Sequence, residues 1–452
     1  MPQNKPYQSF NKRIKEARIN NSEKLDLSYS KRKNKKEIPE NKFIAFFDKL
    51  FNPKDKPLTE IPKEVFKLKN LKSLSLKGNQ LEEIPEAITQ LSDLEKLNLS
   101  DNQLSSLPES IGQLTQLQRL NLTKNQLSTL PESSTNLANL RYLDISRNTF
   151  TTLPNFIGNL TNLTELNSSR NQLEYLPDNI GNHSNLTTLY LTKNQLFDVP
   201  ETFGNLKKLK TLNLSYNKLI NLFESFSDLE SLEVLIIRNN SLTFIPESCG
   251  NLSNLIQMDL SSNQLVRIPK SIGNLSSLQK LSLHLNSLEE LPESISKLNN
   301  LEELSLHMNH LQRLPRSIGL LDKLKELSLS INQLTNIPES IGKLSNLKEL
   351  YLNENHLRYI PGSIFKLSSL TALNLSKNKL EFIPEALENQ QDLINLNIAD
   401  NQLSYLPKSI CKLSNLKYLF LDNNPLENPP LEVATQGIKA IQEYFESSDD
   451  QK

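Results

Sequence analysis

An asparagine recurs every 23 residues along this chain, sixteen times without an insertion, from Asn79 to Asn424. The residue five positions before each of these asparagines is Leu or Met, and the residue three before it is Leu or Ile except at Ser168. A unit of this length cannot bury its apolar side alone, so successive units have to stack on one another. The period therefore predicts an elongated solenoid.

Each unit has the form L-x-x-L-x-L-x-x-N-x-L-x-x-[IL]-P. The alternation L-x-L predicts a short strand with its leucines on one side. Strands separated by 23 residues cannot be joined by a tight hairpin, which indicates a parallel sheet. Proline follows in every unit except at Phe223 and suits the first position of a short helical or 3-10 turn. Eight of the eleven glycines stand where this turn would end in a left-handed residue.

The recurring asparagine is expected inside the core. Its side-chain amide offers both a donor and an acceptor, and the backbone has unpaired groups where the chain leaves the strand. Sixteen such residues in register predict a ladder of polar side chains within an apolar interior.

This combination of strand, asparagine and I-P or L-P turn is identified as the leucine-rich repeat in its 23-residue form, over about residues 58–430. The array resembles those of the Ras–Raf pathway scaffold, of plant Ras-group-related leucine-rich repeat proteins and of many bacterial leucine-rich repeat proteins. The resemblance implies an α/β horseshoe, with a parallel β-sheet on the concave face and short helical or 3-10 turns on the convex face.

The chain is expected to have three parts. Residues 1–57 form an N-terminal cap with a degenerate first repeat, residues 58–430 the array, and residues 431–452 a cap helix with an acidic tail. An apolar stripe in this helix is able to cover the last repeat. Its members are Ile438, Ile441 and Phe445.

The N-terminal part contains several short patterns. Residues 13–28, RIKEARINNSEKLDLS, resemble the helix and first strand that open bacterial arrays, including those attached to Roco GTPases. Residues 41–52 are expected to form an amphipathic helix. The cluster KRKNKK at residues 31–36 is either a targeting signal or a solvated loop. A match to the docking pattern for type 1 protein phosphatase is better explained by a buried helix face, because such short patterns recur by chance. It consists of Lys42, Ile44 and Phe46.

Side chains alternate between the two sides of each predicted strand, and this alternation predicts which residues form the binding face. Residues six, four, two and one before each asparagine, and the one after it, should line the concave surface in columns about 4.8 Å apart. The column one before the asparagine is basic over four repeats, which favours an acidic partner surface unless these charges are simply solvated. These residues are Lys124, Arg147, Arg170 and Lys193. The column six before the asparagine is acidic over three repeats. These residues are Glu303, Glu326 and Glu349.

Four of the five histidines fall on the same face, near the acidic column. They are His284, His307, His310 and His356, accompanied by Leu285, Met308, Ile331 and Tyr351. A mixed surface of this kind is typical of protein interfaces, and protonation near pH 6 would tune it. A zinc site at the neighbouring His284 and His307 is the alternative, but it requires a third converging ligand. No other cofactor is expected.

Composition and missing motifs argue against a nucleic-acid-binding protein, a membrane protein and an enzyme. Equal totals of 51 Lys+Arg and 51 Asp+Glu give no reason to expect nucleic acid as a partner. No run approaches the ~20 apolar residues of a membrane span, and the N-terminus lacks the apolar core of a signal peptide. The expected location is the cytoplasm, or outside the cell through a secretion system that reads no signal peptide. No catalytic motif occurs, and Cys249 and Cys411 are too far apart to pair.

The resulting interpretation is a non-enzymatic monomer whose concave face binds another protein. A bacterial leucine-rich repeat protein or effector is one setting, which the Asn- and Lys-rich composition and the opening helix favour. A signalling scaffold or adaptor for a small GTPase or phosphatase is the other, which the scaffold resemblance implies. A metal-binding protein that uses the concave histidines remains a third possibility.

Irregular residues cluster between positions 165 and 240. Ser168 replaces a core leucine, His183 replaces a leucine on the convex side, and Val234 with Ile236 forms an apolar concave patch. We expect a bend or a secondary contact there, unless the array simply tolerates this drift.

Overall fold

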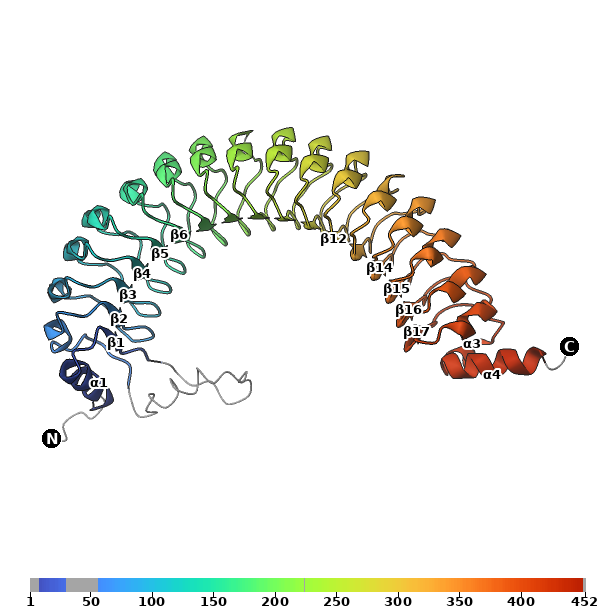
Figure 1. Ribbon diagram of the computed structural model, residues 1–452, viewed down its shortest axis with the longest axis horizontal. Coiled ribbons are helices and arrows are strands. Elements are labelled where there is room, and N and C mark those ends of the chain that lie inside the picture. The colour runs from blue at the N-terminus through green and yellow to red at the C-terminus, as the bar shows by residue number, and fades with distance from the viewer. Residues whose placement is uncertain (1–7, 30–55, 223, 450–452) are drawn as a thin grey trace. The chain divides into compact units, whose positions relative to one another are not determined.

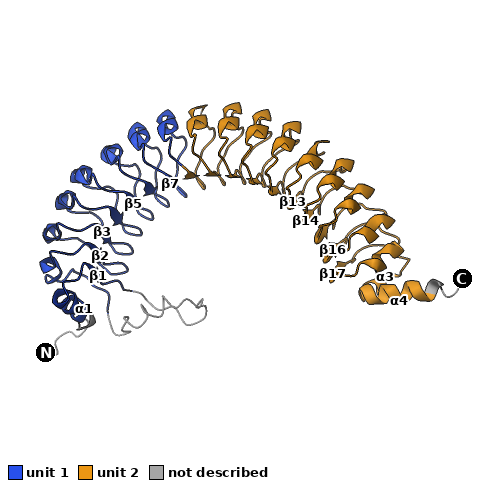
Figure 2. Cartoon of the chain, viewed as in Figure 1, with its two compact units in different colours: residues 1–209 blue, residues 210–452 orange. Residues whose placement is uncertain are grey.

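The computed structural model of the protein describes residues 8–29, 56–222 and 224–449. The chain divides into two compact units, residues 1–209 and residues 210–452 (Figure 2). Within each unit, short strands lie on the inner side of the curve and short helical turns on the outer side (Figure 1). The predicted parallel sheet and 3-10 turns are therefore confirmed in both units.

The strands of the first unit have three residues each and pair in parallel, in chain order. A buried leucine stands at the centre of every one, so the register keeps leucine opposite leucine. The strands are β1 (Lys24–Asp26), β2 (Ser73–Ser75), β3 (Lys96–Asn98), β4 (Arg119–Asn121), β5 (Tyr142–Asp144), β6 (Glu165–Asn167) and β7 (Thr188–Tyr190). The 3-10 turns are η2 (Val65–Lys67), η3 (Glu86–Gln90), η4 (Glu109–Gln113), η5 (Glu132–Asn136), η6 (Asn155–Asn159), η7 (Asp178–Asn182) and η8 (Glu201–Asn205).

The second unit repeats this arrangement, with Met258 in place of one central leucine. Its strands are β8 (Thr211–Asn213), β9 (Val234–Ile236), β10 (Gln257–Asp259), β11 (Lys280–Ser282), β12 (Glu303–Ser305), β13 (Glu326–Ser328), β14 (Glu349–Tyr351), β15 (Ala372–Asn374), β16 (Asn395–Asn397) and β17 (Tyr418–Phe420). Its 3-10 turns are η9 (Glu224–Asp228), η10 (Glu247–Asn251), η11 (Lys270–Asn274), η12 (Glu293–Lys297), η13 (Ile318–Leu320), η14 (Glu339–Lys343), η15 (Gly362–Lys366), η16 (Glu385–Asn389) and η17 (Lys408–Lys412).

The turns differ from the prediction in two details. Pro108 is extended, and η4 begins only at the following residue, so proline precedes the turn instead of starting it. The turn glycines are not left-handed, because among the described glycines only Gly78 and Gly437 have a positive φ. A Cβ at Gly273 would overlap the carbonyl oxygen of Ser294 in the next turn. The expected left-handed exit is thus wrong, and the close approach of neighbouring turns explains the glycine instead.

The asparagine ladder is confirmed, and Asn309 shows its bonds. Its amide nitrogen donates to the carbonyl oxygens of Leu306 and Leu283, each at 3.0 Å. Its amide oxygen accepts the backbone N–H of Leu288, also at 3.0 Å. One buried side chain therefore joins two neighbouring repeats and satisfies three backbone groups that the sheet leaves unpaired.

A left-handed residue stands immediately before every ladder asparagine. Gly78 has a φ of 78°, and the fifteen other residues at this position have φ between 52° and 60°. This conformation costs a residue other than glycine roughly 1–2 kcal/mol, and asparagine or aspartate tolerates it best. The conformation leads the chain out of the strand, and none of these side chains is buried.

Helices cover both ends of the array. Helix α1 (Gln8–Ile19) precedes β1, which confirms the predicted opening of a helix followed by a first strand. At the other end, α3 (Leu431–Ala434) leads into α4 (Ile438–Asp449). Ile441 and Phe445 of α4 are buried, and Ile438 is half-buried, as expected of a cap helix.

Several predictions fall on residues 30–55, outside the part of the chain that the structure describes. They are the amphipathic helix at 41–52, the KRKNKK cluster and the docking pattern of Lys42, Ile44 and Phe46.

Two irregular residues are core defects of the first unit. Ser168 is fully buried, and its hydroxyl has no partner among the described residues. His183 is also fully buried, with Nδ1 3.2 Å from the Leu160 carbonyl oxygen, and its Nε2 finds no partner in the part of the chain that the structure describes. Burial lowers the pKa of His183 to about 4, against the opposing effect of the bond to Leu160.

Candidate protein-binding site

Three glutamates lie side by side on the second unit. The strand register pairs Glu303 with Glu326, and Glu326 with Glu349, as predicted for this column. On β11, Lys280 places its ammonium 2.6 Å from the Glu303 carboxylate. No ion pair among the described residues includes Glu326 or Glu349, so the unbalanced negative charge of the column is centred on these two residues.

The environment of Glu326 and Glu349 favours the approach of a positively charged group. Burial raises the pKa of Glu326, and the neighbouring carboxylates of Glu349 and Glu303 raise it further. The hydroxyl of Tyr351 donates a hydrogen bond to Glu349, and this bond is the main reason that the pKa of Tyr351 rises to about 12. A basic group from a partner would relieve the repulsion between the two carboxylates.

The two column neighbours His284 and His307 form a stacked pair. Their ring centroids are 4.3 Å apart, and the ring planes differ by 11°. The hydroxyl of Ser305 lies 3.3 Å from Nδ1 of His284 and 3.0 Å from Nδ1 of His307. Burial lowers the pKa of both rings, and the charge of His284 lowers that of His307 further. This pair therefore protonates at a lower pH than ordinary histidines do.

The histidine pair does not form the core of a metal site in this geometry. Both Nδ1 atoms are directed at the Ser305 hydroxyl. Within residues 8–29, 56–222 and 224–449, no three His, Cys, Asp or Glu side chains come together as metal ligands. The third converging ligand that a zinc site requires is therefore not provided by the described residues.

An apolar stripe runs beside the histidine pair. Leu285, Met308 and Ile331 occupy the position before the ladder asparagine in three consecutive repeats. Each has a left-handed backbone with φ 56°, and each side chain is 40% exposed. Isolated exposed leucines are common on proteins, but three adjacent apolar residues that keep 40% of their surface exposed on a left-handed backbone are unusual.

The other predicted residues of the second unit lie on the same surface. Tyr351 is half-buried on β14, next to the acidic column. His310 and His356 are exposed and stand one residue after their ladder asparagines. The Nδ1 atom of His310 lies 3.5 Å from the Gln333 amide nitrogen.

The basic column belongs to the first unit and is a separate candidate surface. Lys124, Arg147, Arg170 and Lys193 are exposed and occupy the left-handed position of their repeats. Lys124 is partly neutralised, because its ammonium lies 2.5 Å from the Asp101 carboxylate of the preceding repeat. The predicted charge stripe is therefore weaker than the sequence alone indicated.

Two residues of the site were not predicted. Lys280 shares the column of Glu303, so the column alignment already contained its signal. The role of Ser305 depends on the ring orientations of two histidines, and no sequence pattern gives these.

Comparisons with known proteins agree with this architecture. Family models match residues 91–175 and 202–304 as a leucine-rich repeat region, residues 54–104 and 322–380 as leucine rich repeat, and residues 185–206 as a further leucine rich repeat. No curated protein sequence matches the chain.

Solved structures give the same result. A leucine-rich repeat protein of Leptospira interrogans is 37% identical, with a TM-score of 0.72 over 84% of this chain and 91% of its own. The plant peptide hormone receptor RGFR1, in complex with RGF2, is 33% identical, with a TM-score of 0.63 over 81% of this chain and 69% of its own. An internalin of Listeria monocytogenes, 23% identical with a TM-score of 0.58, covers 79% of this chain and 88% of its own and shares the fold.

The chain belongs to the leucine-rich repeat family. Proteins of this family generally mediate protein–protein interaction and are typically not enzymes. In the described part of the chain, no helix has both the length and the apolar character needed to cross a bilayer.

Proposed function

We propose that the protein binds a protein partner through the inner face of β11 to β14 in the second unit. The stripe of Leu285, Met308 and Ile331 carries this proposal. Each of these residues is exposed, and each adopts a backbone conformation that disfavours its own side chain. Folding gains nothing from the exposed part of these side chains, whereas an interface gains from apolar side chains at its centre.

The neighbouring polar groups give the interface a chemical character. Glu326 and Glu349 supply uncompensated negative charge, and the His284–His307 pair supplies flat aromatic surface. A partner with apolar and basic groups complements this surface. A strand sheet held by a buried asparagine ladder is rigid, so little conformational entropy is lost on binding.

A triple variant, Leu285→Asn, Met308→Asn and Ile331→Asn, tests the proposal. Asparagine tolerates the left-handed conformation and already stands at this position as Asn239 and Asn423. We expect the free energy of unfolding to stay equal or rise by about 1 kcal/mol, because strain is relieved. Affinity for the partner should fall by about 100-fold, since three central apolar contacts are lost. Affinity capture from lysates, with mass spectrometry of retained proteins, supplies the partner for this measurement.

Two matched variants act as controls. Ser262→Asn makes the same kind of change at the same position of the preceding repeat and should bind like the native protein. The pair Arg147→Asn and Arg170→Asn removes charge from the basic column of the first unit. If the partner is lost from that pair and kept by the triple variant, the interface lies on the first unit and the proposal is wrong.

We place the protein among bacterial leucine-rich repeat proteins that act on other proteins as effectors. The 37% identity with the Leptospira protein supports the bacterial part of this setting. Its location in the cytoplasm, or outside the cell after export without a signal peptide, is part of the same proposal. Fractionation of the producing cells tests the location, and capture of a small GTPase or phosphatase as the partner would favour the adaptor setting instead.

A further inference from the structure

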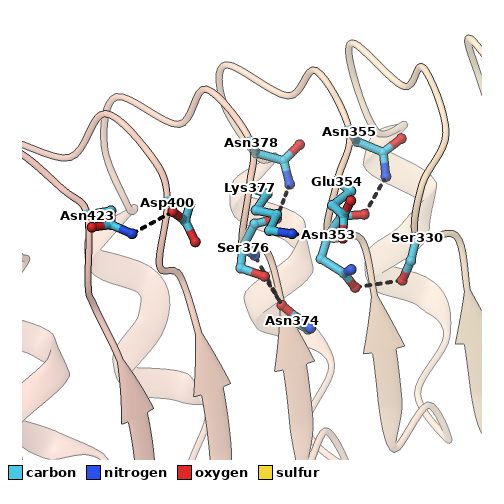
Figure 3. Close-up of polar contacts among 10 residues, drawn as sticks. All are labelled: Ser330, Asn353, Glu354, Asn355, Asn374, Ser376, Lys377, Asn378, Asp400 and Asn423. Atoms are coloured by element: carbon cyan, nitrogen blue, oxygen red, sulfur yellow. Dashed lines mark hydrogen bonds and ion pairs between the residues drawn. The ribbon is translucent and has the colours of Figure 1, made fainter.

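Half of the sixteen repeats protect one backbone N–H on the inner face with a side chain. The residue four before the ladder asparagine is Asn or Asp in eight described repeats, and its side-chain oxygen accepts the N–H two residues later. These bonds measure 2.9–3.1 Å. Figure 3 shows Asn374 and Ser376, one such pair.

Four consecutive repeats of the second unit lack this protection. The protecting position holds Ser282, Ser305, Ser328 and Tyr351 instead of Asn or Asp. The backbone N–H groups that it would serve have no acceptor among the described residues of the chain. They belong to His284, His307, Ser330 and Asn353. Figure 3 includes the last two, whose side chains bond to each other at 2.6 Å.

These four donors face a potential ligand. In the protected repeats the acceptor is a side chain that projects from the inner face of a strand, so the N–H two residues later points to that face. Successive repeats stack about 4.8 Å apart, which spaces the four donors evenly along the unit. An unpaired backbone N–H that a partner covers needs a new acceptor.

The residues around the four unprotected N–H groups indicate which kind of ligand group would accept their hydrogen bonds. On one side lies the apolar stripe of Leu285, Met308 and Ile331, one residue further along each chain segment. On the other side lies the acidic column, with Glu326 and Glu349, four residues back or about 13 Å along each strand. A carboxylate or phosphate ligand would be repelled by this column, whereas a neutral peptide carbonyl is not.

We infer that the partner lays an extended polypeptide segment along the unprotected N–H groups of His284, His307, Ser330 and Asn353, with apolar side chains on the stripe and Lys or Arg side chains toward Glu326 and Glu349. Side chains of an extended segment alternate between two sides of its backbone, so one segment reaches both rows. The carbonyl groups on the sheet-facing side of an extended segment recur at every second residue, about 6.8 Å apart, whereas the four donors span about 14 Å. Two or three of these carbonyls therefore accept hydrogen bonds from these N–H donors, as peptides do when they add to exposed backbone groups. This inference rests on the proposed function and specifies the chemistry of the partner.

A variant that restores the missing protection tests the inference. Ser282→Asn, Ser305→Asn and Ser328→Asn place in these repeats the residue that protects six others. The matched control, Ser282→Ala, Ser305→Ala and Ser328→Ala, also removes the three hydroxyls but leaves the N–H groups open. Slower amide hydrogen exchange at His307 and Ser330 in the Asn variant, and not in the Ala variant, verifies that the new bonds form.

The probe is a displayed library of linear peptides, selected on the full native chain. We expect enrichment of peptides that alternate apolar residues with Lys or Arg. Because the Ala variant also lacks the Ser305 hydroxyl between the two histidines, it is the reference for this measurement. These peptides should bind the Asn variant about tenfold more weakly than the Ala variant or worse, the effect of losing about one net hydrogen bond. The double variant Glu326→Gln and Glu349→Gln should also bind the selected peptides more weakly than the native chain does.

Three results overturn the inference. They are equal binding to the Asn and Ala variants, enrichment of acidic peptides, and no enrichment of any linear peptide. The proposed function is judged separately by the captured protein partner. A partner that needs Leu285, Met308 and Ile331 but binds the Asn variant normally would dock through side chains alone, which keeps the proposed function and removes the peptide backbone contacts.

Discussion

Replacement of Asn309 by alanine is expected to lower the free energy of unfolding by about 3 kcal/mol or more, because three buried backbone groups lose their partners at about 1–3 kcal/mol each. The groups are the carbonyls of Leu283 and Leu306 and the N–H of Leu288. The side chain is only 4% exposed, so water cannot readily replace it. Urea denaturation of the full chain, with hydrogen exchange at Leu288 as a local readout, measures the loss.

A surface asparagine provides the matched control. Asn300 also donates its amide to a carbonyl of the preceding repeat, that of Ser276 at 2.8 Å, but the residue is half-buried and this bond lies at the solvent-exposed surface. Asn300→Ala should cost below about 1 kcal/mol, because water takes over the bond. Asn309→Asp should remain strongly destabilising, since a carboxylate keeps the acceptor and loses both donors. Similar stability for Asn309→Ala and Asn300→Ala would contradict the role of the ladder.

The second prediction is that His183 makes the stability of the folded protein depend on pH. Its folded-state pKa of about 4 lies below the unfolded value of 6.5, because burial disfavours the charged ring. The unfolded chain therefore binds a proton more readily, and stability falls as the pH drops from 6.5 toward 4. The full shift corresponds to about 3 kcal/mol at the acid end. Above pH 6.5 both states are neutral, and this contribution to pH dependence vanishes.

His183→Leu restores the residue found at this position in most repeats and should remove the acid sensitivity. It should also stabilise the protein at pH 7.5, because the unpaired Nε2 disappears from the core. Thermal unfolding at pH 7.5, 5.5 and 4.5 follows both effects, with His310→Gln on the exposed face as the control for loss of a histidine. A constant difference between native and His183→Leu at all three pH values would refute the assignment.

Much of the fold was predictable because one residue fixes the register. The position of Asn309 and its equivalents determines the strand, the buried leucines and the columns on the inner face. Errors arose where conformation depends on tertiary contact. The turn glycines are set by the neighbouring turn, as Gly273 against Ser294 shows, and their sequence position alone resembles a left-handed exit. The real left-handed position was hidden because residues as different as Lys124 and Ile331 occupy it.

The site was predictable as a set of columns but not as a set of bonds. The adjacency of Glu303, Glu326 and Glu349 followed directly from the period. The pairing of Lys280 with Glu303 depends on side-chain conformations, which no pattern gives. The unprotected N–H groups had a visible signal, the change from Asn or Asp to Ser in the column of Ser305, but its meaning requires the protected repeats as a reference.

The spacing of the ladder bonds also limits how this protein can diverge. Except for Asn79, whose amide donates to the carbonyl oxygen of Leu27, each buried ladder asparagine bonds to groups 3, 21 and 26 residues earlier in the chain, as Asn309 does with Leu306, Leu288 and Leu283. One inserted residue would displace these partners in two repeats at once, whereas exchange of the exposed side chain just before the asparagine disturbs none of them. New binding preferences should therefore arise in this lineage by substitution at fixed length, and chain length should change by whole repeats.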